Sequence, residues 1–402
     1  MIKIINGKIL EGENTLVDKE ILIKDDKIVK IEDKILDYAD EIIDAKGGFI
    51  MPGATDVHVH FREPGFEAKE TIKTGTLASA KGGFTCVMPM PNLNPTPDDL
   101  KSLNVELEII KRDAKVKCFP YATLTKKEEG KELSNLDELA PYVKAFSDDG
   151  KGVNNLDLLY KGMEIAKKYN LPIACHAETV TGKTKPEGEY EAVIRDIEIA
   201  KKTGARYHFC HMSTKESIDA IKKARDLGYN NITYEITPHH LVLNEDMIKD
   251  GNWKMNPPLR SEDDRKRVEE ALISGEADII ACDHAPHTEE EKNQDYLKCP
   301  NGIIGIETEL PIIYHYFVKS GKISLRRFLD VLVYNPNRIF NLPEHDIKVG
   351  SIADIAILDI NNLHTYTKDE ILSKGTNCPY IGMSFYGFNI CTILDGKVIY
   401  KA

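Results

Sequence analysis

The sequence lacks a long apolar run and any paired cysteine motif, and its basic residues are outnumbered by acidic ones. No window approaches the roughly 18 consecutive apolar residues of a membrane span, so we expect no membrane association. The N-terminus has no basic stretch followed by an apolar one, and we therefore expect a cytoplasmic protein. The eight cysteines are scattered without a CxxC pair, which argues against a disulfide framework or a cysteine-type zinc site.

The charge balance argues against one further class of protein. The 53 Lys and Arg residues against 65 Asp and Glu residues give a net charge of −12, which is unsuited to binding nucleic acid by neutralising phosphates. With 42% hydrophobic and 29% charged residues, the composition is that of a globular protein. At roughly 150 residues per domain, a chain of 402 residues holds two or three domains, although one α/β barrel uses about 250.

The two ends of the chain carry β-hairpin signals that the middle lacks. Short apolar runs flank Asn6-Gly7, Asp25-Asp26 and Asp395-Gly396, and such pairs favour tight hairpin turns because their residues accept positive φ. We therefore predict a small β-sandwich domain built from both termini, residues 1–50 plus 345–402. The middle, residues 51–344, is then an insertion into that domain.

The middle of the chain alternates short apolar runs with stretches of helical periodicity. Eight strands are predicted, at residues 54–60, 84–89, 116–123, 143–147, 172–176, 206–211, 232–237 and 278–283. Helices are predicted between most of them, for example at residues 68–81, 156–168, 190–202, 215–227 and 262–273. Eight strands alternating with helices match a closed (β/α)8 TIM barrel, so we predict the α/β class with that architecture.

The end of the first of these strands reads Val57-His58-Val59-His60. Side chains at positions i and i+2 of a strand point the same way, about 7 Å apart, so the two imidazoles can grip one ion. By the same alternation, Val57 and Val59 are predicted to face the surrounding helices. The alternative for this pair alone is two buried, hydrogen-bonded histidines.

Further metal-binding side chains end four other predicted strands. Strand four is followed by Asp148 and Asp149, strands five and six end at His176 and His211, and strand eight ends at Asp283. The active site of a barrel lies at these carboxyl ends. Neutral imidazole and carboxylate suit zinc and similar divalent ions, and a carboxylate from strand four could bridge two ions. The pattern favours a metal-dependent hydrolase.

Longer motifs surround these residues. They are found at residues 52–65 (PGATDVHVHFREPG), 82–85 (GGFT), 88–92 (MPMPN), 145–150 (AFSDDG), 211–216 (HMSTKE), 237–241 (TPHHL), 254–260 (KMNPPLR) and 283–288 (DHAPHT). In these motifs, which span most of the chain, the sequence resembles the amidohydrolase superfamily and, within it, the class I dihydroorotases. The resemblance also implies the barrel and the composite β domain.

The resemblance implies a centre of two zinc ions. The implied ligands are His58, His60 and Asp283 for the first ion, and His176 and His211 for the second. Asp149 and a hydroxide would bridge the two ions. Asp149 is preferred to Asp148 because the motif of the family places the ligand directly before the glycine.

The resemblance also implies a reaction. It is the reversible, zinc-dependent hydrolysis of the cyclic amide of (S)-dihydroorotate to N-carbamoyl-L-aspartate, in de novo pyrimidine (UMP) biosynthesis. A hydroxide attacks the ring carbonyl, and Asp283 is the catalytic residue that passes the proton to the departing ring nitrogen. The protein would thus be a cyclic amidohydrolase with a small-molecule substrate.

Substrate contacts are implied as well. Arg62 lies two residues beyond the His-x-His pair, and its guanidinium suits the carboxylate of the substrate. The resemblance adds the side chains of Asn92, Asn256 and His287, and the backbone of Asn301-Gly302. The alternatives are a surface ion pair for Arg62, and turn residues near proline for Asn92 and Asn256.

Other conspicuous residues have structural interpretations. His208 is predicted to lie on the strand face opposite His211, packed or hydrogen-bonded, and His239 and His240 to orient the loop after the seventh strand. The cysteines beside the metal ligands alternate away from the metals, so we expect them to pack against helices. These are Cys175, Cys210 and Cys282.

Three departures from the family bear on these predictions. The segment after His176 is shorter than in bacterial members, which leaves the closure of a lid open. Asn301 stands where many relatives have phenylalanine. The fourth strand ends in Asp rather than in the carboxylated lysine of hydantoinases and dihydropyrimidinases, and Lys144 lies too far from the strand end to replace it.

Two rival functions are open at this point. One is the opening of another cyclic amide, such as a hydantoin, a dihydropyrimidine or allantoin, against which the missing lysine and Arg62 argue. The other is an inactive homologue that serves as a structural partner of aspartate transcarbamoylase, against which the complete set of metal ligands argues. Association of an active enzyme with aspartate transcarbamoylase, and a homodimer, are also open.

Overall fold

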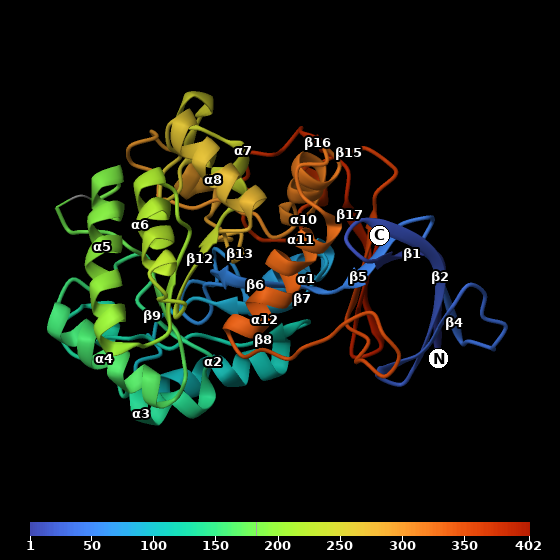
Figure 1. Cartoon of the computed structure of the whole chain (residues 1–402), viewed down its shortest axis with the longest axis horizontal. Helices are drawn as coiled ribbons and strands as arrows, with labels where there is room; N and C mark the ends of the chain where they lie inside the picture. The colour runs from blue at the N-terminus through green and yellow to red at the C-terminus, as the bar shows by residue number, and fades with distance from the viewer. Residues whose placement is uncertain (182) are drawn as a thin grey trace.

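The computed structural model describes residues 1–181 and 183–402, and Gly182, in the short segment after His176, lies outside the described residues. Figure 1 shows a set of central strands surrounded by helices beside a separate sheet, and both ends of the chain lie at that sheet. Among the described residues, no helix is both long and apolar enough to cross a membrane.

The central strands form a closed parallel barrel. They are β6 (Ala54–Val59), β7 (Phe84–Pro89), β8 (Lys117–Cys118), β9 (Phe146–Ser147), β10 (Ile173–Cys175), β11 (Tyr207–Phe209), β12 (Ile232–Ile236) and β13 (Ile279–Ile280). The ladders β6-β7-β8 and β9-β10-β11-β12-β13 are joined at their two seams by the parallel bridges Ala122–Phe146 and Val59–His284. All eight predicted strands are therefore confirmed, although most are shorter than predicted.

Helices surround the barrel. The longer ones are α1 (Ile72–Gly82), α2 (Leu100–Asp113), α4 (Leu156–Lys168), α5 (Pro186–Thr203), α6 (Lys215–Asp226) and α8 (Glu262–Ser274). Shorter ones are α3 (Leu136–Leu139), α7 (Pro238–Val242), α9 (Glu289–Lys292), α10 (Glu309–Ile313), α11 (Leu325–Leu329) and α12 (Asn335–Ile339). Sequence signals mark several ends: a capping box at Thr71 starts α1, and left-handed glycines at Gly83 and Gly275 end α1 and α8. The five predicted helices are all present.

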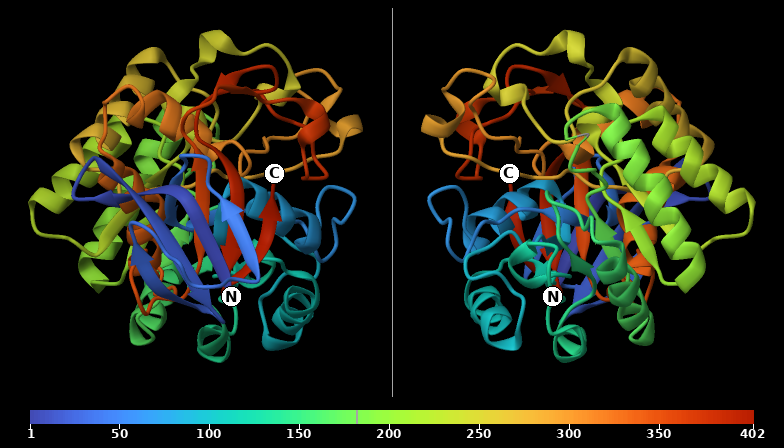
Figure 2. Two further views of the ribbon diagram at one scale, coloured as in Figure 1. Left: turned by 90° about the vertical axis from the view of Figure 1, so that its right-hand side faces the viewer. Right: turned by 90° about the vertical axis from the view of Figure 1, so that its left-hand side faces the viewer.

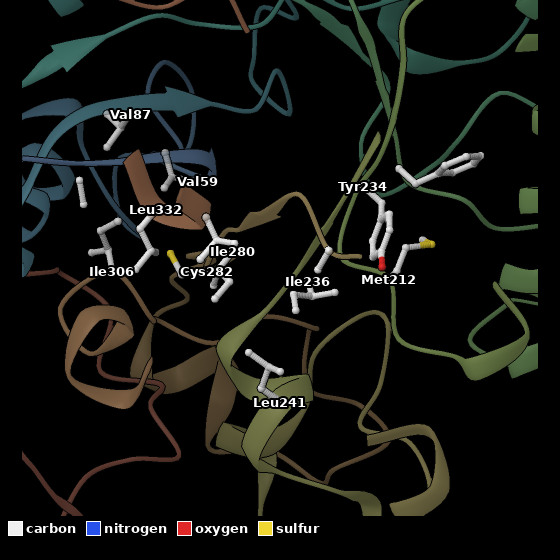
Figure 3. Close-up of a cluster of buried hydrophobic side chains, with 14 of the residues drawn as sticks. Val59, Val87, Met212, Tyr234, Ile236, Leu241, Ile280, Cys282, Ile306 and Leu332 are labelled. Carbon is white, nitrogen blue, oxygen red and sulfur yellow. The ribbon is translucent and has the colours of Figure 1, made fainter. Parts of the chain in front are cut away.

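Two layers of apolar side chains pack on the barrel strands. Residues of four barrel strands, and residues next to three others, contact one another in one cluster, which places that cluster inside the closed sheet; its members include Val57, Met88, Tyr121, Ala145, Ala174 and Cys210. A second, larger cluster lies between the strands and the helices, and Figure 3 shows part of it, with Val59, Val87 and Cys282.

Two predictions about strand faces are wrong. Val57 and Cys210 were expected against the helices but lie in the inner cluster, whereas Val59, Cys175 and Cys282 belong to the outer one as expected. The pairing of β6 with β7 advances from Asp56–Val87 to Val59–Pro89, three residues against two. Such a bulge breaks the two-residue alternation on which the prediction for Val57 rested. Cys210 lies one residue beyond the end of β11 at Phe209, so the alternation of a regular strand does not extend to it.

The second sheet is built from both ends of the chain, as predicted. Its strands are β1 (Ile2–Glu11), β2 (Thr15–Lys24), β3 (Lys27–Glu32), β4 (Glu41–Asp44), β5 (Phe49–Pro52), β14 (Ile355–Asp359), β17 (Phe388–Leu394) and β18 (Lys397–Lys401), and a separate pair is β15 (His364–Thr365) and β16 (Ser384–Phe385). The C-terminal β14 pairs with the N-terminal β5, and Figure 2 shows strands from the two ends side by side. The predicted domain limits, 1–50 plus 345–402 around 51–344, stay a proposal.

One of the three predicted hairpins is wrong. The turns at Asp25-Asp26 and Asp395-Gly396 join antiparallel partners, β2 with β3 and β17 with β18. Asn6 does adopt positive φ, 54°, but β1 continues through Asn6-Gly7 and shifts its register against β2 there. The left-handed residue thus makes a bulge in one strand rather than a turn between two.

Candidate metal centre

All six predicted metal ligands come together at the carboxyl ends of the barrel strands. His58 lies in β6 and His60 directly follows it, Asp149 follows β9, and Asp283 follows β13. His176 and His211 follow β10 and β11 in the same way. All six side chains are buried. The sequence placed these residues near strand ends because each apolar run stops close to its polar residue, although several strands end earlier than predicted.

The first group is formed by the histidines of β6 and two carboxylates. Nε2 of His60 lies 3.0 Å from Oδ1 of Asp283, and Nε2 of His58 lies 3.5 Å from the same oxygen. Asp149 faces both histidines, with Oδ1 at 3.6 Å from His58 and Oδ2 at 3.5 Å from His60. These four side chains therefore surround one small space.

The second group lies on the other side of Asp149. Its Oδ1 is 3.6 Å from Nε2 of His211 and 3.9 Å from Nδ1 of His176. The two imidazoles approach each other to 3.0 Å between His176 Nδ1 and His211 Nε2. Because the carboxylate of Asp149 faces the histidines of both groups, it is placed to be shared between two cations.

Asp148 is turned away from the histidines and holds a loop. Its carboxylate accepts the backbone N–H of Leu124 at 2.8 Å and of Thr125 at 3.0 Å. Burial raises the pKa of Asp148 to about 6, although these hydrogen bonds act in the opposite direction. Geometry therefore favours Asp149 over Asp148 as the shared carboxylate, in agreement with the motif.

The donor set fits a divalent metal. Nε2 of His58 and Oδ1 of Asp149 are buried polar atoms that have no hydrogen-bond partner among the described residues, and such atoms are costly unless a ligand satisfies them. Three sets of donor atoms lie within 4.8 Å of one another and share these residues: His58/His60/Asp149, His58/His211/Asp283 and Asp149/His176/His211. Burial alone would raise the pKa of Asp149, but His58 and His211 hold that pKa well below its ordinary value, so the carboxylate is ionised.

Backbone strain is concentrated at this site. Arg62, His211 and Asp283 adopt the left-handed region, with φ of 63°, 38° and 50°. Side chains other than glycine avoid this region, and strained residues of this kind cluster at active sites. His211 directly follows Cys210, so the backbone there departs from the regular strand on which the prediction for Cys210 rested.

A glutamate that sequence reasoning missed contacts two of the predicted metal-binding histidines. Oε1 of Glu235, on β12, lies 2.6 Å from Nδ1 of His58 and accepts the backbone N–H of His211 at 3.2 Å. Its Oε2 lies 3.1 Å from Nε2 of His208. A carboxylate on the far nitrogen of a ligating histidine fixes its tautomer and raises its basicity. Although burial would raise the pKa of Glu235, the neighbouring His58 and His208 lower it, so Glu235 is a carboxylate.

Two other histidines near the centre make hydrogen bonds with structural roles. His208 is hydrogen-bonded, as predicted, but it shares Glu235 with His58, so the prediction that it faces away from the site is wrong. His240 contacts Thr237 Oγ1 at 2.8 Å through Nδ1, and the carbonyl of Pro257 at 3.2 Å through Nε2. It thereby ties the loop after β12 to the segment that carries Asn256.

A cavity of about 200 Å³ opens beside the metal ligands. It is lined by His60, Arg62, Asn92, Asp149, Gly150, His176, Asn256, Asp283, Ala285, Asn301 and Gly302. Five of the six predicted substrate contacts thus surround the cavity. His287 stands behind it, with Nε2 at 2.8 Å from the carbonyl oxygen of Asn301. A larger cavity, about 680 Å³, lies at Tyr334 and His345 and contains none of these side chains.

Arg62 brings a positive charge to the cavity. Its Nε donates to the carbonyl of Pro286 at 3.4 Å, and no carboxylate of the described residues lies within ion-pair distance of its guanidinium. Burial lowers the pKa of Arg62, while Asp283 and Asp149 act in the opposite direction. A half-buried guanidinium without an anionic partner favours a ligand that supplies one.

Comparisons with known proteins agree with this geometry. The family model described as "Dihydro-orotase-like" matches residues 47–187. Dihydroorotase from Staphylococcus epidermidis is 43% identical, with 98% of each chain covered, and that from Fusobacterium nucleatum is 42% identical, with 98% of this chain and 97% of the relative covered. Among solved structures, the L-hydantoinase (dihydropyrimidinase) from Arthrobacter aurescens has a TM-score of 0.90 at 25% identity, covering 100% of this chain and 96% of its own.

The barrel, the sheet beside it and the histidine–carboxylate centre define a metal-dependent hydrolase of the amidohydrolase superfamily. The D-hydantoinase from a Thermus species shares this fold, with a TM-score of 0.88 at 23% identity over 100% of this chain and 96% of its own. Within the superfamily, the chain belongs to the dihydroorotase family, because its similarity to dihydroorotases extends over nearly its whole length.

Proposed function

We propose that this protein catalyses the reversible hydrolysis of (S)-dihydroorotate to N-carbamoyl-L-aspartate, as a step of de novo pyrimidine biosynthesis. Family membership supports the reaction class. The assignment of the substrate rests on Arg62. It is a cation without an anionic partner, and it lies in a cavity that also holds His60, Asp149 and Asp283. A cyclic amide that bears a carboxylate fits this cavity, because its carboxylate can pair with Arg62 while its amide lies beside His60, Asp149 and Asp283.

We propose that two zinc ions occupy the centre. His58, His60 and Asp283 would hold one ion, His176 and His211 the other, with Asp149 between them. The shared position of Asp149 and the unpartnered buried atoms of His58 and Asp149 support this assignment. Zinc at such a site lowers the pKa of bound water towards neutrality and polarises a carbonyl oxygen.

Asp283 is the proposed proton carrier. It lines the cavity, and its Oδ1 contacts His60 at 3.0 Å. Burial would raise the pKa of Asp283, but His58 and His60 lower it, so the carboxylate is ionised and able to accept a proton. It takes the proton from the attacking water and delivers it to the departing ring nitrogen. Ring closure uses the same residue in the reverse direction.

The other cavity residues are proposed to bind the substrate. Arg62 would pair with the carboxylate, and Asn92 and Asn256 would contact the ring. Gly302 has φ of 136°, and a Cβ there would lie 2.6 Å from the carbonyl of Ala285, so only glycine fits this backbone beside the cavity. His287 uses Nε2 on the Asn301 carbonyl, and burial lowers the pKa of His287 to about 3, so its ring is neutral. Its direct contact with substrate stays a prediction.

The test of this function is an assay with two substrates. Ring opening of dihydroorotate and of dihydrouracil should be compared on the zinc-loaded protein by ultraviolet absorbance. We expect turnover of dihydroorotate and little or none of dihydrouracil, since a neutral ring leaves Arg62 without a carboxylate. Preference for dihydrouracil would instead favour a hydantoinase-like activity. Absence of both turnover and bound zinc would favour an inactive homologue.

We also propose a cytoplasmic location. Association with aspartate transcarbamoylase and formation of a homodimer are further proposals that the similarity to dihydroorotases motivates. Light scattering of the purified protein, alone and with aspartate transcarbamoylase, tests both. A mass of about 45 kDa for the protein alone would exclude the homodimer.

A further inference from the structure

Asp56 is a buried carboxylate on β6 that the proposed mechanism does not use. It has no exposed surface, and it lies two residues before His58. Its Oδ1 accepts the backbone N–H of His58 at 2.8 Å. Its Oδ2 accepts the backbone N–H of Cys282, the residue before Asp283, at 3.1 Å. One carboxylate thus holds the backbone beside two ligands of the same proposed ion.

These two hydrogen bonds lie where the barrel has few others. Between the first and last strands of the barrel, the described pairing is the bridge Val59–His284, together with the His60 N–H donating to the His284 carbonyl at 2.8 Å. The backbone is irregular on both sides, with a bulge after Asp56 in β6 and left-handed φ at Asp283. A seam with so little regular pairing leaves the spacing of His58 and Asp283 to side-chain contacts.

Glu309, at the start of α10, lies against this carboxylate. Asp56, Cys282 and Glu309 each place a donor atom within 4.8 Å of the other two, and no cationic side chain of the described residues forms an ion pair with either acid. Two carboxyl groups so close together in a buried place do not both ionise. Burial and the proximity of Asp56 raise the pKa of Glu309, which makes Glu309 the neutral partner. The two oxygens of Asp56 accept the two backbone N–H groups, and Glu309 packs against the same carboxyl group.

We infer that Asp56 is a positioning residue for the first proposed zinc ion, which fixes the distance between His58 and Asp283 across the barrel seam. The inference rests on the two-zinc assignment of the proposed function. The side chain of Asp56 does not contact the ion. It acts through the backbone of its neighbours, as groups behind metal ligands do in other proteins.

The experiment measures zinc retention rather than turnover. Wild type and Asp56→Asn are loaded with zinc, and the ions per chain are counted during competition with a chromophoric chelator. The asparagine keeps the size of the side chain but presents an N–H to one of the two donors. We expect one of two ions to bind 10- to 100-fold more weakly in Asp56→Asn while the other is unchanged.

A matched control separates positioning from stability. Asp264 is also a buried carboxylate that accepts a backbone N–H, from Lys215 at 3.0 Å, but it lies at α8 away from the centre. Asp264→Asn is expected to lower the melting temperature and keep both ions at wild-type affinity. If Asp56→Asn fails to fold, Asp56→Ser, which shortens the side chain and cannot accept both N–H groups at once, serves in its place with the same expected loss of one ion.

The outcomes distinguish the two proposals. Equal retention of both ions by wild type and by the Asp56 variant that folds would overturn the role of Asp56 and leave the proposed function intact. Wild-type protein that binds no zinc, or one ion only, would overturn the two-zinc assignment itself.

Discussion

Nδ1 of His58 lies 2.6 Å from Oε1 of Glu235, although the two residues are 177 positions apart in the chain. The same carboxylate reaches His208 and the backbone of His211. A buried glutamate thus sits behind the metal centre and connects β6, β11 and β12. Its position means that the orientation of His58 depends on three strands of the barrel.

Removing the charge of Glu235 should weaken metal binding. We expect Glu235→Gln to bind zinc 10- to 100-fold more weakly than wild type, because the imidazole of His58 loses the carboxylate that raises its basicity. Isothermal titration of the metal-free protein with zinc measures the change. Glu216→Gln, at an exposed position of α6, is the control and should behave as wild type. Unchanged affinity in Glu235→Gln would contradict the role given to this contact.

Replacement of Asp283 should separate folding from turnover. We expect Asp283→Asn to lose at least about 10³-fold in kcat, because an amide cannot accept the proton, while the fold is retained. Circular dichroism and a thermal melt check the fold, and atomic absorption checks the metal content. Asp263→Asn, on the exposed side of α8, is the matched control. Near-normal turnover of Asp283→Asn would remove Asp283 from the proton transfer.

Arg62 should determine how tightly the protein binds the substrate through its carboxylate. We expect Arg62→Met to raise KM for dihydroorotate about 10- to 100-fold, the loss typical of a hydrogen bond between charged groups. Steady-state kinetics measure the effect. The control is Arg112→Met, which alters an arginine exposed on α2. A KM within twofold of wild type would show that the carboxylate binds elsewhere.

Stability should fall as the pH drops below about 6.5, partly through His240. Burial and the charge of Arg260 lower the pKa of His240 to about 4, so between pH 4 and 6.5 the unfolded chain binds more protons than the folded one. Stability therefore rises with pH through this window, by at most about 1.4 kcal/mol per pH unit for this group.

A variant isolates the share of His240 in this acid sensitivity. His240→Gln should be less stable than wild type at pH 7, because it loses the ring contacts to Thr237 and Pro257, and its stability should change less between pH 6.5 and 4.5. Urea unfolding at a series of pH values measures both effects. Parallel pH profiles for the two proteins would assign the sensitivity to other groups.

The gathering of the six proposed ligands at one place could be predicted from the sequence because each one lies at or near the end of an apolar run. A run such as 54–60 sets the strand and its direction, and the barrel brings all carboxyl ends to one face. The helices followed from their periodicity and caps in the same way. Local pattern was sufficient wherever the backbone stayed regular.

The failures came from irregular backbone and from contacts between distant residues. The bulge in β6 turned Val57 inward, and the left-handed Asn6 continued a strand instead of ending it. Local sequence does not distinguish the bulge at Asn6 from a tight turn, because both place a residue with positive φ there. Glu235 was missed because it sits within β12 rather than at its end, and its partner His58 belongs to a strand far away in the chain.

The most direct test of the central claim is anomalous X-ray scattering at the zinc edge from crystals of the zinc-loaded protein with dihydroorotate. We predict two peaks at the mouth of the barrel, about 2.0–2.1 Å from histidine nitrogens, with His58, His60 and Asp283 on one ion and His176 and His211 on the other. Asp149 should contact both ions, and Arg62 should contact the carboxylate of the ligand. Zinc peaks elsewhere, or a zinc-free centre with these six side chains unligated, would contradict the account.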